Sequence, residues 1–371
     1  MIRKIVKYVG IPIACLVVFV LSSALLYRKY LQHRVAEDRA IRSRDGINSL
    51  EPVRLGGIDQ WIEVRGHNVN NPILLFIHGG PGLAFIPMAG AFQDPWEKYF
   101  TVVQWDQRGA GKTYASNDKE LQRSTMSVPQ MEQDTLDVVN YLRNRFHRKK
   151  IFVLGHSWGS LLGLWLAHEH PETIYAYVGV GQVVNPEQNE EIAYRDALQE
   201  ARNRHNEQAV KDLENIAPYP PPNVDLAKGQ IAHSWQVELL GPPANRVGFL
   251  DGRRLVSTLV SAPEYSLADD FGFVHGQLFS LEILTPEMME VDLDKLGPDF
   301  RVPILFFEGR HDPYCLPSLI QEYSQAIKAP QKDLIWFDNS GHFPFFEEKQ
   351  KFADELFQRV LPLAADRQDG N

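Results

Sequence analysis

Short, nearly continuous apolar runs that end in glycine-containing turns restrict the fold of this chain more than any other feature. Such runs are typical of strands that are buried on both faces of a parallel sheet. Between them, apolar residues recur at helical spacing over 128–146 and 160–168. This alternation predicts an α/β fold with a mostly parallel sheet flanked by helices. The predicted strands are 73–77, 101–105, 151–154, 175–180, 304–307 and 334–337.

The alternation stops between 182 and 300. The sequence there is helix-prone and charged, and Pro-rich turns interrupt it. An insertion of this size between strands of one sheet predicts a helical cap domain over 182–300. The remaining segments, 51–181 and 301–371, would then form one α/β domain. A hairpin around Gly56 and Gly57 is expected near the start of that domain.

The N-terminal region has a different composition. No charged residue occurs from 8 to 27, and a helix needs about twenty apolar residues to cross a bilayer. We predict a transmembrane anchor over 8–27 and a juxtamembrane linker over 28–50. A cleaved signal peptide is the alternative, because Ser22 and Ala24 are small residues near the end of the run.

The charges beside the apolar run do not decide its orientation. Lys and Arg are more numerous after the run than before it, which favours a cytoplasmic body. A short charged N-terminus followed by one apolar helix also fits the opposite orientation. We therefore predict a single-pass membrane protein and leave the side of the α/β domain open.

Composition excludes several kinds of protein. The net charge is −9, and Lys and Arg cluster only in the N-terminal region, so nucleic-acid binding is not expected. The chain has only two cysteines, Cys15 and Cys315. Two cysteines are too few for a disulfide framework or a cysteine-built zinc site.

The motif with the clearest chemistry is Gly155-His156-Ser157-Trp158-Gly159. It lies between the predicted strand 151–154 and the predicted helix 160–168, which is the context that a nucleophile elbow requires. A sharp turn there would hold the serine in a strained conformation, and the flanking glycines would avoid clashes. Ser157 is therefore the predicted nucleophile.

A serine nucleophile needs a base, and the base needs an acid to orient it. Asp312 follows the strand 304–307 and His342 follows the strand 334–337, so both fit the expected order of serine, acid and histidine. Both would lie at the C-terminal ends of strands, where parallel sheets bind ligands. Asp338 or Asp333 as the acid and His311 as the base are rivals that fit this order and position less well.

A second glycine-rich turn, 78–82, follows the strand 73–77. Such a turn lets backbone N–H groups approach a reacting oxyanion. We expect one donor from Gly80, with Gly79 as the next choice, and the other from Trp158, the residue after the nucleophile. His78 comes too early in the chain to be the base and is expected to pack or hydrogen-bond.

The segment 109–113 resembles the end of a phosphate-binding loop. However, Asp106 occupies the position of the required first glycine, so nucleotide binding is not expected. Asp106 and Arg108 are instead expected to hold neighbouring loops in a structural turn.

Taken together, the motifs 78–82, 106–111, 155–160 and 309–312 resemble those of the prolyl aminopeptidase (proline iminopeptidase) family of α/β hydrolases. The resemblance covers about 53–181 and 300 to the C-terminus. It implies an α/β-hydrolase fold and removal of an N-terminal residue, often proline, from peptides. It also implies cap carboxylates that hold the substrate amine, but no acidic motif of the cap matches. The cap glutamates considered are Glu187, Glu190, Glu191, Glu207 and Glu214.

The leading hypothesis is therefore a membrane-anchored serine aminopeptidase that forms an acyl-enzyme and needs no metal or organic cofactor. A carboxylesterase, thioesterase or lactonase could use the same catalytic residues on a small acyl substrate. A catalytically idle binding protein is the third hypothesis. An epoxide hydrolase or dehalogenase is disfavoured, because those enzymes use aspartate at the position of Ser157.

Overall fold

In the computed structural model, which describes residues 11–242 and 252–364, the predicted strands join one eight-stranded sheet. The strand order is β1-β2-β4-β3-β5-β6-β7-β8. β1 and β2 form an antiparallel hairpin, β2 also pairs antiparallel with β4, and the remaining pairs are parallel. The strands are β1 (Ile47–Leu55), β2 (Ile58–Gly66), β3 (Ile73–Ile77), β4 (Thr101–Asp106), β5 (Ile151–His156), β6 (Ile174–Val180), β7 (Ile304–Gly309) and β8 (Lys332–Phe337).

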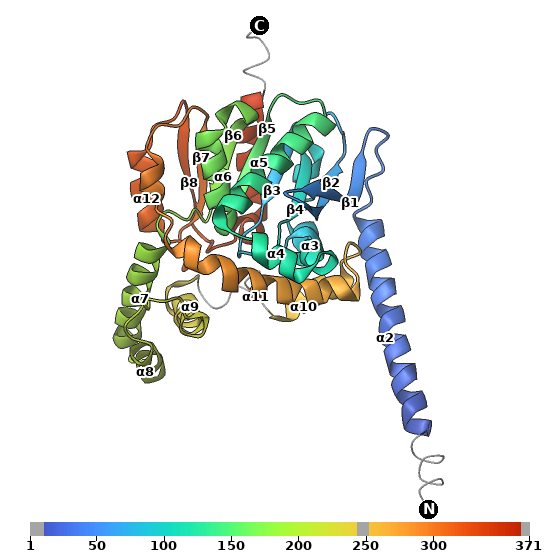
Figure 1. Cartoon of the computed structure of the whole chain (residues 1–371), viewed down its shortest axis with the longest axis horizontal. Coiled ribbons are helices and arrows are strands. Elements are labelled where there is room, and N and C mark those ends of the chain that lie inside the picture. The colour runs from blue at the N-terminus through green and yellow to red at the C-terminus, as the bar shows by residue number, and fades with distance from the viewer. Residues whose placement is uncertain (1–10, 243–251, 365–371) are drawn as a thin grey trace, which may run out of the picture.

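The sheet is buried on both faces because its strands alternate their side chains between two hydrophobic cores. Leu75 and Ile77 of β3 point into one core, while Leu74 and Phe76 point into the other. Helices cover both faces (Figure 1). The helices of the α/β domain are α3 (Gly111–Ser116), α4 (Lys119–Thr125), α5 (Val128–Arg145), α6 (Trp158–Glu169), α12 (Pro317–Ala326), α13 (Pro344–Glu347) and α14 (Lys349–Glu355). A π-helical turn, Leu356–Val360, continues α14.

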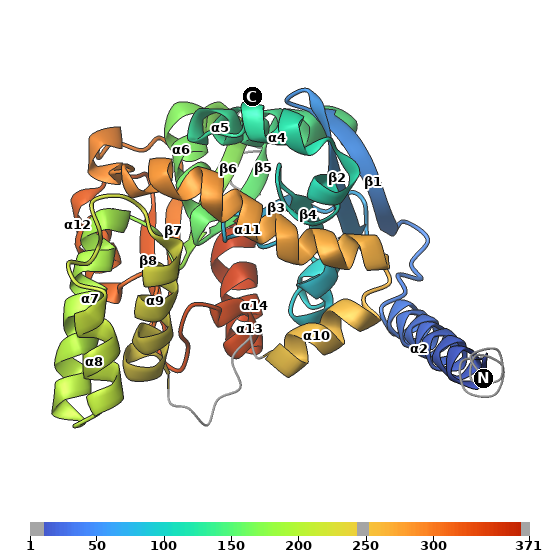
Figure 2. The same ribbon diagram turned by 60° about the horizontal axis from the view of Figure 1, so that its bottom comes forward.

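Between β6 and β7, the elements that the structure describes in 181–242 and 252–303 are helices, and they lie below the sheet in Figure 1. The α-helices are α7 (Pro186–Asn203), α8 (Glu207–Asn215), α9 (Leu226–Leu240), α10 (Gly252–Ser261) and α11 (Leu267–Met289). The long helix α11 runs across the ends of the strands, as Figure 2 shows. There Ser280 Oγ donates to the carbonyl of Gly109 (3.0 Å), which lies in the turn after β4. The cap helices thus cover the C-terminal ends of the strands.

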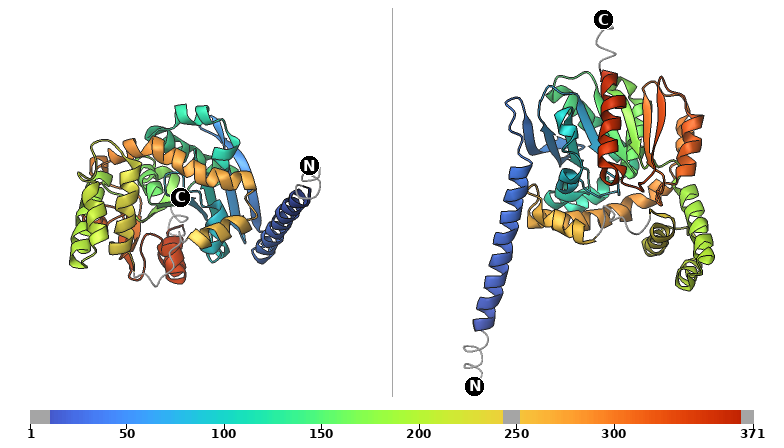
Figure 3. Two further views of the ribbon diagram at one scale, coloured as in Figure 1. Left: turned by 90° about the horizontal axis from the view of Figure 1, so that it is seen from below. Right: turned by 180° about the vertical axis from the view of Figure 1, so that it is seen from behind.

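The N-terminal helix is longer than the predicted anchor. Helix α2 runs from Ile11 to Asp38, so it includes part of the predicted linker 28–50, and β1 begins within that linker at Ile47. By length and composition α2 could cross a membrane, and a signal sequence would pass the same test. It projects from the body on the side of the cap (Figures 1 and 3).

Candidate active site

Ser157 occupies the sharp turn between β5 and α6. Its φ of 53° lies in a region that residues with a side chain rarely adopt, and its N–H donates to the carbonyl of Val180 (2.9 Å). The flanking glycines are required by the close packing of this turn. A Cβ atom at Gly155 would lie 2.4 Å from the carbonyl oxygen of Gly159, and one at Gly159 would lie 2.1 Å from that of Ile77.

Asp312 and His342 are brought together at the ends of β7 and β8. His342 Nδ1 lies 2.7 Å from Asp312 Oδ2, and both side chains are buried. The other carboxylate oxygen, Oδ1, accepts the N–H groups of Tyr314 (2.8 Å) and Cys315 (2.9 Å). These contacts fix the orientation of the carboxylate and therefore the tautomer of the imidazole, with its proton on Nδ1.

The end of β6 links this pair to the nucleophile. Val180 accepts the hydrogen bond from Ser157, and the next residue, Gly181, has a φ of 54°. A Cβ atom on Gly181 would lie 2.9 Å from His342 Nδ1 and 3.3 Å from Asp312 Oδ2. The three predicted residues therefore surround the C-terminal ends of β5, β6 and β7.

The rival residues have other partners. Asp338 accepts hydrogen bonds from Arg310 on the exposed surface (3.1 Å), and Asp333 accepts one from Gln331 (2.8 Å). His311 is exposed. His78 is buried, its Nδ1 lies 2.9 Å from the Gly79 carbonyl, and burial lowers its pKa to about 4. His78 is thus a neutral hydrogen-bonding residue, as predicted.

The glycine-rich turn after β3 lies against the nucleophile. A Cβ atom at Gly79 would lie 2.9 Å from Ser157 Cβ, so this position has no room for a side chain. Gly80 has a φ of 122°, which glycine adopts readily. Trp158 is the first residue of α6, and its indole N–H donates to Gln107 Oε1 (3.1 Å). The turn and the first turn of α6 therefore flank Ser157.

The turn 106–109 is structural, as predicted. Arg108 forms a fully buried ion pair with Asp134 (2.9 Å) and also donates to the carbonyl of Gly56 (2.7 Å). Asp106 accepts hydrogen bonds from the Lys112 N–H and the Tyr265 hydroxyl. These contacts join the β1–β2 hairpin, α5 and the start of α11 to one turn.

One carboxyl group beneath the site was missed by the sequence reasoning. Glu308, the fifth residue of β7, is buried, and its Oε1 accepts the N–H of Gln182 (3.0 Å). Burial, reinforced by the charge of Asp312, raises the pKa of Glu308 well above its usual range. The signal in the sequence was an acidic residue at the end of an otherwise apolar strand.

A second group lies in the cap and contains Glu190, one of the glutamates considered above; the sequence reasoning missed its partner His233. Glu190 of α7 accepts hydrogen bonds from His233 Nε2 of α9 (2.9 Å) and from the Tyr219 hydroxyl (2.6 Å). The His233 ring packs edge-on against the Tyr314 ring, and the Tyr314 ring lies 5.0 Å from that of His342. Despite burial, these hydrogen bonds lower the pKa of Glu190 and raise that of His233.

Asp312, Cys315 and His342 present ligand atoms within 4.8 Å of one another. This grouping is a poor cation site. Both oxygens of Asp312 already accept hydrogen bonds, and burial raises the pKa of the Cys315 thiol well above its usual range, which disfavours the thiolate that binds metals.

Known proteins share this architecture. A family model described as "alpha/beta hydrolase fold" matches residues 72–220. The probable aminopeptidase YbaC of Bacillus subtilis (strain 168) is 32% identical over 320 residues, 85% of this chain and 97% of that protein. A probable proline iminopeptidase of Leptolyngbya boryana is 34% identical over 285 residues, 74% of this chain and 82% of that protein. The crystal structure of a bacterial membrane phospholipase A has a TM-score of 0.59 at 18% identity and covers 98% of this chain and 99% of its own, a likeness of fold alone.

Proposed function

Because this chain belongs to the family of α/β hydrolases that includes the proline iminopeptidases, we propose that it is a membrane-anchored serine aminopeptidase. The observation that carries the proposal is the strained Ser157 beside a buried Asp312–His342 hydrogen bond. This is the arrangement that activates a serine hydroxyl.

In the proposed mechanism, His342 takes the proton of Ser157 through Nε2 while Asp312 holds the proton on Nδ1. The serine attacks the carbonyl carbon, and the oxyanion accepts hydrogen bonds from the N–H groups of Gly80 and Trp158. His342 then protonates the leaving amine, and a water molecule hydrolyses the acyl-enzyme with the same base.

Glu190 is the cap carboxylate that we propose for the substrate's ammonium group. Through His233 and Tyr314 it is connected by direct contacts to the ring of His342. A carboxylate has about four acceptor positions, so Glu190 retains capacity for an ammonium group beside its hydrogen bonds from His233 and Tyr219.

An esterase, thioesterase or lactonase is the second candidate. The ion pair between Glu190 and His233 favours it. When His233 is protonated, its charge compensates that of Glu190. A neutral acyl substrate would then enter without competing for the carboxylate.

Turnover by the full-length protein in detergent micelles distinguishes these candidates. Proline and other aminoacyl arylamides are compared with short-chain acyl esters in wild type, Ser157→Ala and Ser234→Ala, an exposed serine of α9. Arylamide cleavage that only Ser157→Ala abolishes supports the aminopeptidase. Turnover of esters alone favours the second candidate, and turnover unaffected by Ser157→Ala refutes both.

Glu190→Gln and Glu187→Gln test the amine site as a matched pair, because Glu187 is exposed on the same helix. We expect Glu190→Gln to raise KM for aminoacyl arylamides and to leave ester turnover unchanged. An equal effect on both substrate classes, or the same effect from Glu187→Gln, would contradict this assignment.

A further inference from the structure

The apolar helix α2 is held to the body at the point where its apolar run ends. Arg28, the first charged residue after that run, pairs with Asp270 and donates to the carbonyl of Tyr265 (3.0 Å). One turn later, Gln32 donates to the carbonyls of Ala262 (2.8 Å) and Tyr265 (3.0 Å). Arg28 and Gln32 are both buried, so the segment that joins α10 to α11 is bonded to α2.

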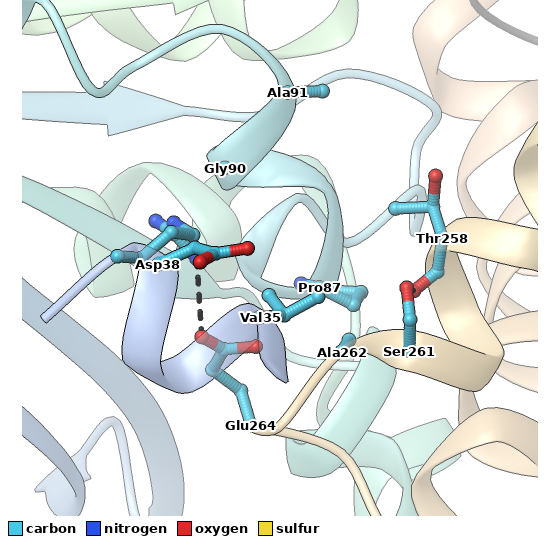
Figure 4. Close-up of a pocket in the computed structure, with 10 residues that line it drawn as sticks. Val35, Asp38, Pro87, Gly90, Ala91, Thr258, Ser261, Ala262 and Glu264 are labelled. Carbon is cyan, nitrogen blue, oxygen red and sulfur yellow. Dashed lines mark hydrogen bonds and ion pairs between the residues drawn. The ribbon is translucent and has the colours of Figure 1, made fainter. Parts of the chain in front are cut away.

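A second joint lies at Arg39, the first residue after the end of α2. Arg39 pairs with Asp94 (3.2 Å) and Glu264 (3.2 Å) beside a cavity of about 280 Å³ between α2 and α10 (Figure 4). The two joints are eleven residues apart, or roughly 16 Å along a helix. Two attachments at this separation fix the direction of α2 relative to the cap.

Helix α11 exposes an apolar strip on the side that faces away from the sheet. Leu267, Phe271, Val274 and Leu278, called here the α11 strip, are 50%, 68%, 51% and 58% exposed. Their spacing of four, three and four residues places them on one face of the helix. Between Leu267 and Leu278, a segment the structure describes in full, none of the exposed residues is an acid, lysine or arginine.

The α11 strip begins at the level where α2 ceases to be apolar. Asp270, the partner of Arg28, lies in the first turn of α11 between Leu267 and Phe271. Figures 1 and 3 show α10 and α11 on the side toward which α2 projects, running across its direction. The exposed rings of Tyr27 and Tyr30 stack at this level, 6.4 Å apart. Tyrosine is enriched at membrane–water interfaces.

Helix α10 adds further features of a membrane-facing surface. Val256 is exposed, and so is Arg253, whose charge suits anionic lipid headgroups. The more distant cap helices α7 and α8 instead expose many charged residues. Helix α9 also exposes Leu226, Ile231 and Val237, each at about 40%. Among the described cap residues, the large apolar side chains that are at least half exposed all lie on α10 and α11, the helices beside α2.

We propose that the α11 strip is a second membrane contact, which lies in the interfacial region of the bilayer that α2 crosses. The proposal rests on the membrane anchoring proposed above but not on the reaction catalysed. Burial of an apolar helix face at the headgroup level is favourable in free energy, because it removes apolar surface from water. The anchor keeps the helix at that level.

This contact would bring the active site close to lipid. The inner face of α11 packs on the loops of the site: Ser280 bonds the Gly109 carbonyl, and a Cβ atom on Gly82 would lie 2.7 Å from Ser280 Cβ. Helix α11 would thus lie between the glycine-rich turn and the bilayer. Substrates with an apolar portion could then reach the cap directly from the membrane.

The test is a fluorescence measurement on the full chain in vesicles of phosphatidylcholine and phosphatidylglycerol. Cys15→Ala removes the exposed native thiol, and the other native thiol, Cys315, is buried. An environment-sensitive dye is attached at Phe271→Cys or, as the control, at Lys149→Cys. Lys149 is exposed and precedes β5, so it lies at the N-terminal ends of the parallel strands, opposite the cap.

We expect the dye at position 271 to have a blue-shifted emission spectrum. Lipids with spin-labelled acyl chains should reduce its fluorescence intensity several-fold, and the dye at position 149 should show neither effect. Equal, unquenched spectra at both positions in protein that floats with the vesicles would overturn the membrane contact but leave the anchor intact. Protein that does not float with the vesicles would overturn both the membrane contact and the anchor. The proposed reaction would be unaffected, because Ser157-dependent turnover is measured separately in detergent. Shielding at 271 that acyl-chain quenchers do not reach would indicate a second copy of the chain instead.

A matched pair of variants separates lipid contact from local packing. Val274→Ser with Leu278→Ser should reduce quenching at position 271, whereas Tyr99→Ser, an exposed aromatic residue on the loop before β4, should not. Unchanged quenching in the double variant would count against the strip as the contact. The dye at position 271 with the strip otherwise intact tests the proposal even where the double variant fails to fold.

Discussion

Replacement of Asp312 by asparagine should abolish most catalysis while it preserves the fold. Oδ1 of Asp312 accepts two backbone N–H groups, from Tyr314 and Cys315, so the amide oxygen of an asparagine must take that position. The amide NH₂ would then face His342 Nδ1, 2.7 Å away, and could only donate to it. The imidazole proton would move to Nε2, which could no longer accept the proton of Ser157.

The expected loss in kcat is about 10⁴-fold, the size of effect seen when this tautomer is lost in other serine hydrolases. It corresponds to roughly 5 kcal/mol of transition-state stabilisation. Acyl-ester turnover of Asp312→Asn, with thermal unfolding to verify folding, measures it. Asp338→Asn is the control, because Asp338 pairs with Arg310 on the exposed surface and should matter little.

A loss below about tenfold in a folded Asp312→Asn protein would refute this reasoning, because a misprotonated base cannot sustain such turnover. An equal loss in Asp338→Asn would instead identify that aspartate as part of the orienting machinery.

Three further predictions concern groups around the site. Arg108→Ala should lower the free energy of unfolding in urea by about 3–5 kcal/mol, because it leaves the buried carboxylate of Asp134 without its cation; a change within experimental error would contradict the importance of this pair. Burial raises the pKa of Glu308, so the folded chain keeps a proton that the unfolded chain releases above Glu's ordinary pKa of about 4.3, and wild-type stability should fall as the pH rises past that value. Glu308→Gln, which mimics the neutral acid, should remove this part of the slope in thermal unfolding from acid to alkaline pH; an unchanged slope would show that Glu308 is ionised. Despite burial, the hydrogen bond to Glu190 raises the pKa of His233, so His233 loses its charge only at a pH above the ordinary histidine pKa of about 6.5, and the ratio of aminoacyl-arylamide to ester turnover should rise there. His233→Gln should make that ratio independent of pH, and a ratio that still rises would assign the titration to another group.

Local patterns in the sequence were sufficient for the sheet and the nucleophile turn. Buried parallel strands leave continuous apolar runs, and β3, β4, β5, β6 and β7 lie where those runs predicted them. The nucleophile turn is also recognisable in the sequence by the glycines beside Ser157. Each of them lies too close to a neighbouring carbonyl to carry a side chain. Strand order follows only partly from such patterns, since it depends on crossovers between distant segments.

The sequence by itself determined the parallel sheet, the elbow at Ser157 and the positions of Asp312 and His342 at strand ends. Each of these features depends on backbone geometry that only certain neighbouring residues permit. The tertiary structure alone decided which cap residues approach the site, and that α2 is bonded to the segment before α11. Glu190 and His233 lie 43 residues apart, and Arg28 and Asp270 lie 242 apart. Contacts over such separations depend on how whole helices pack, which no local periodicity or motif records.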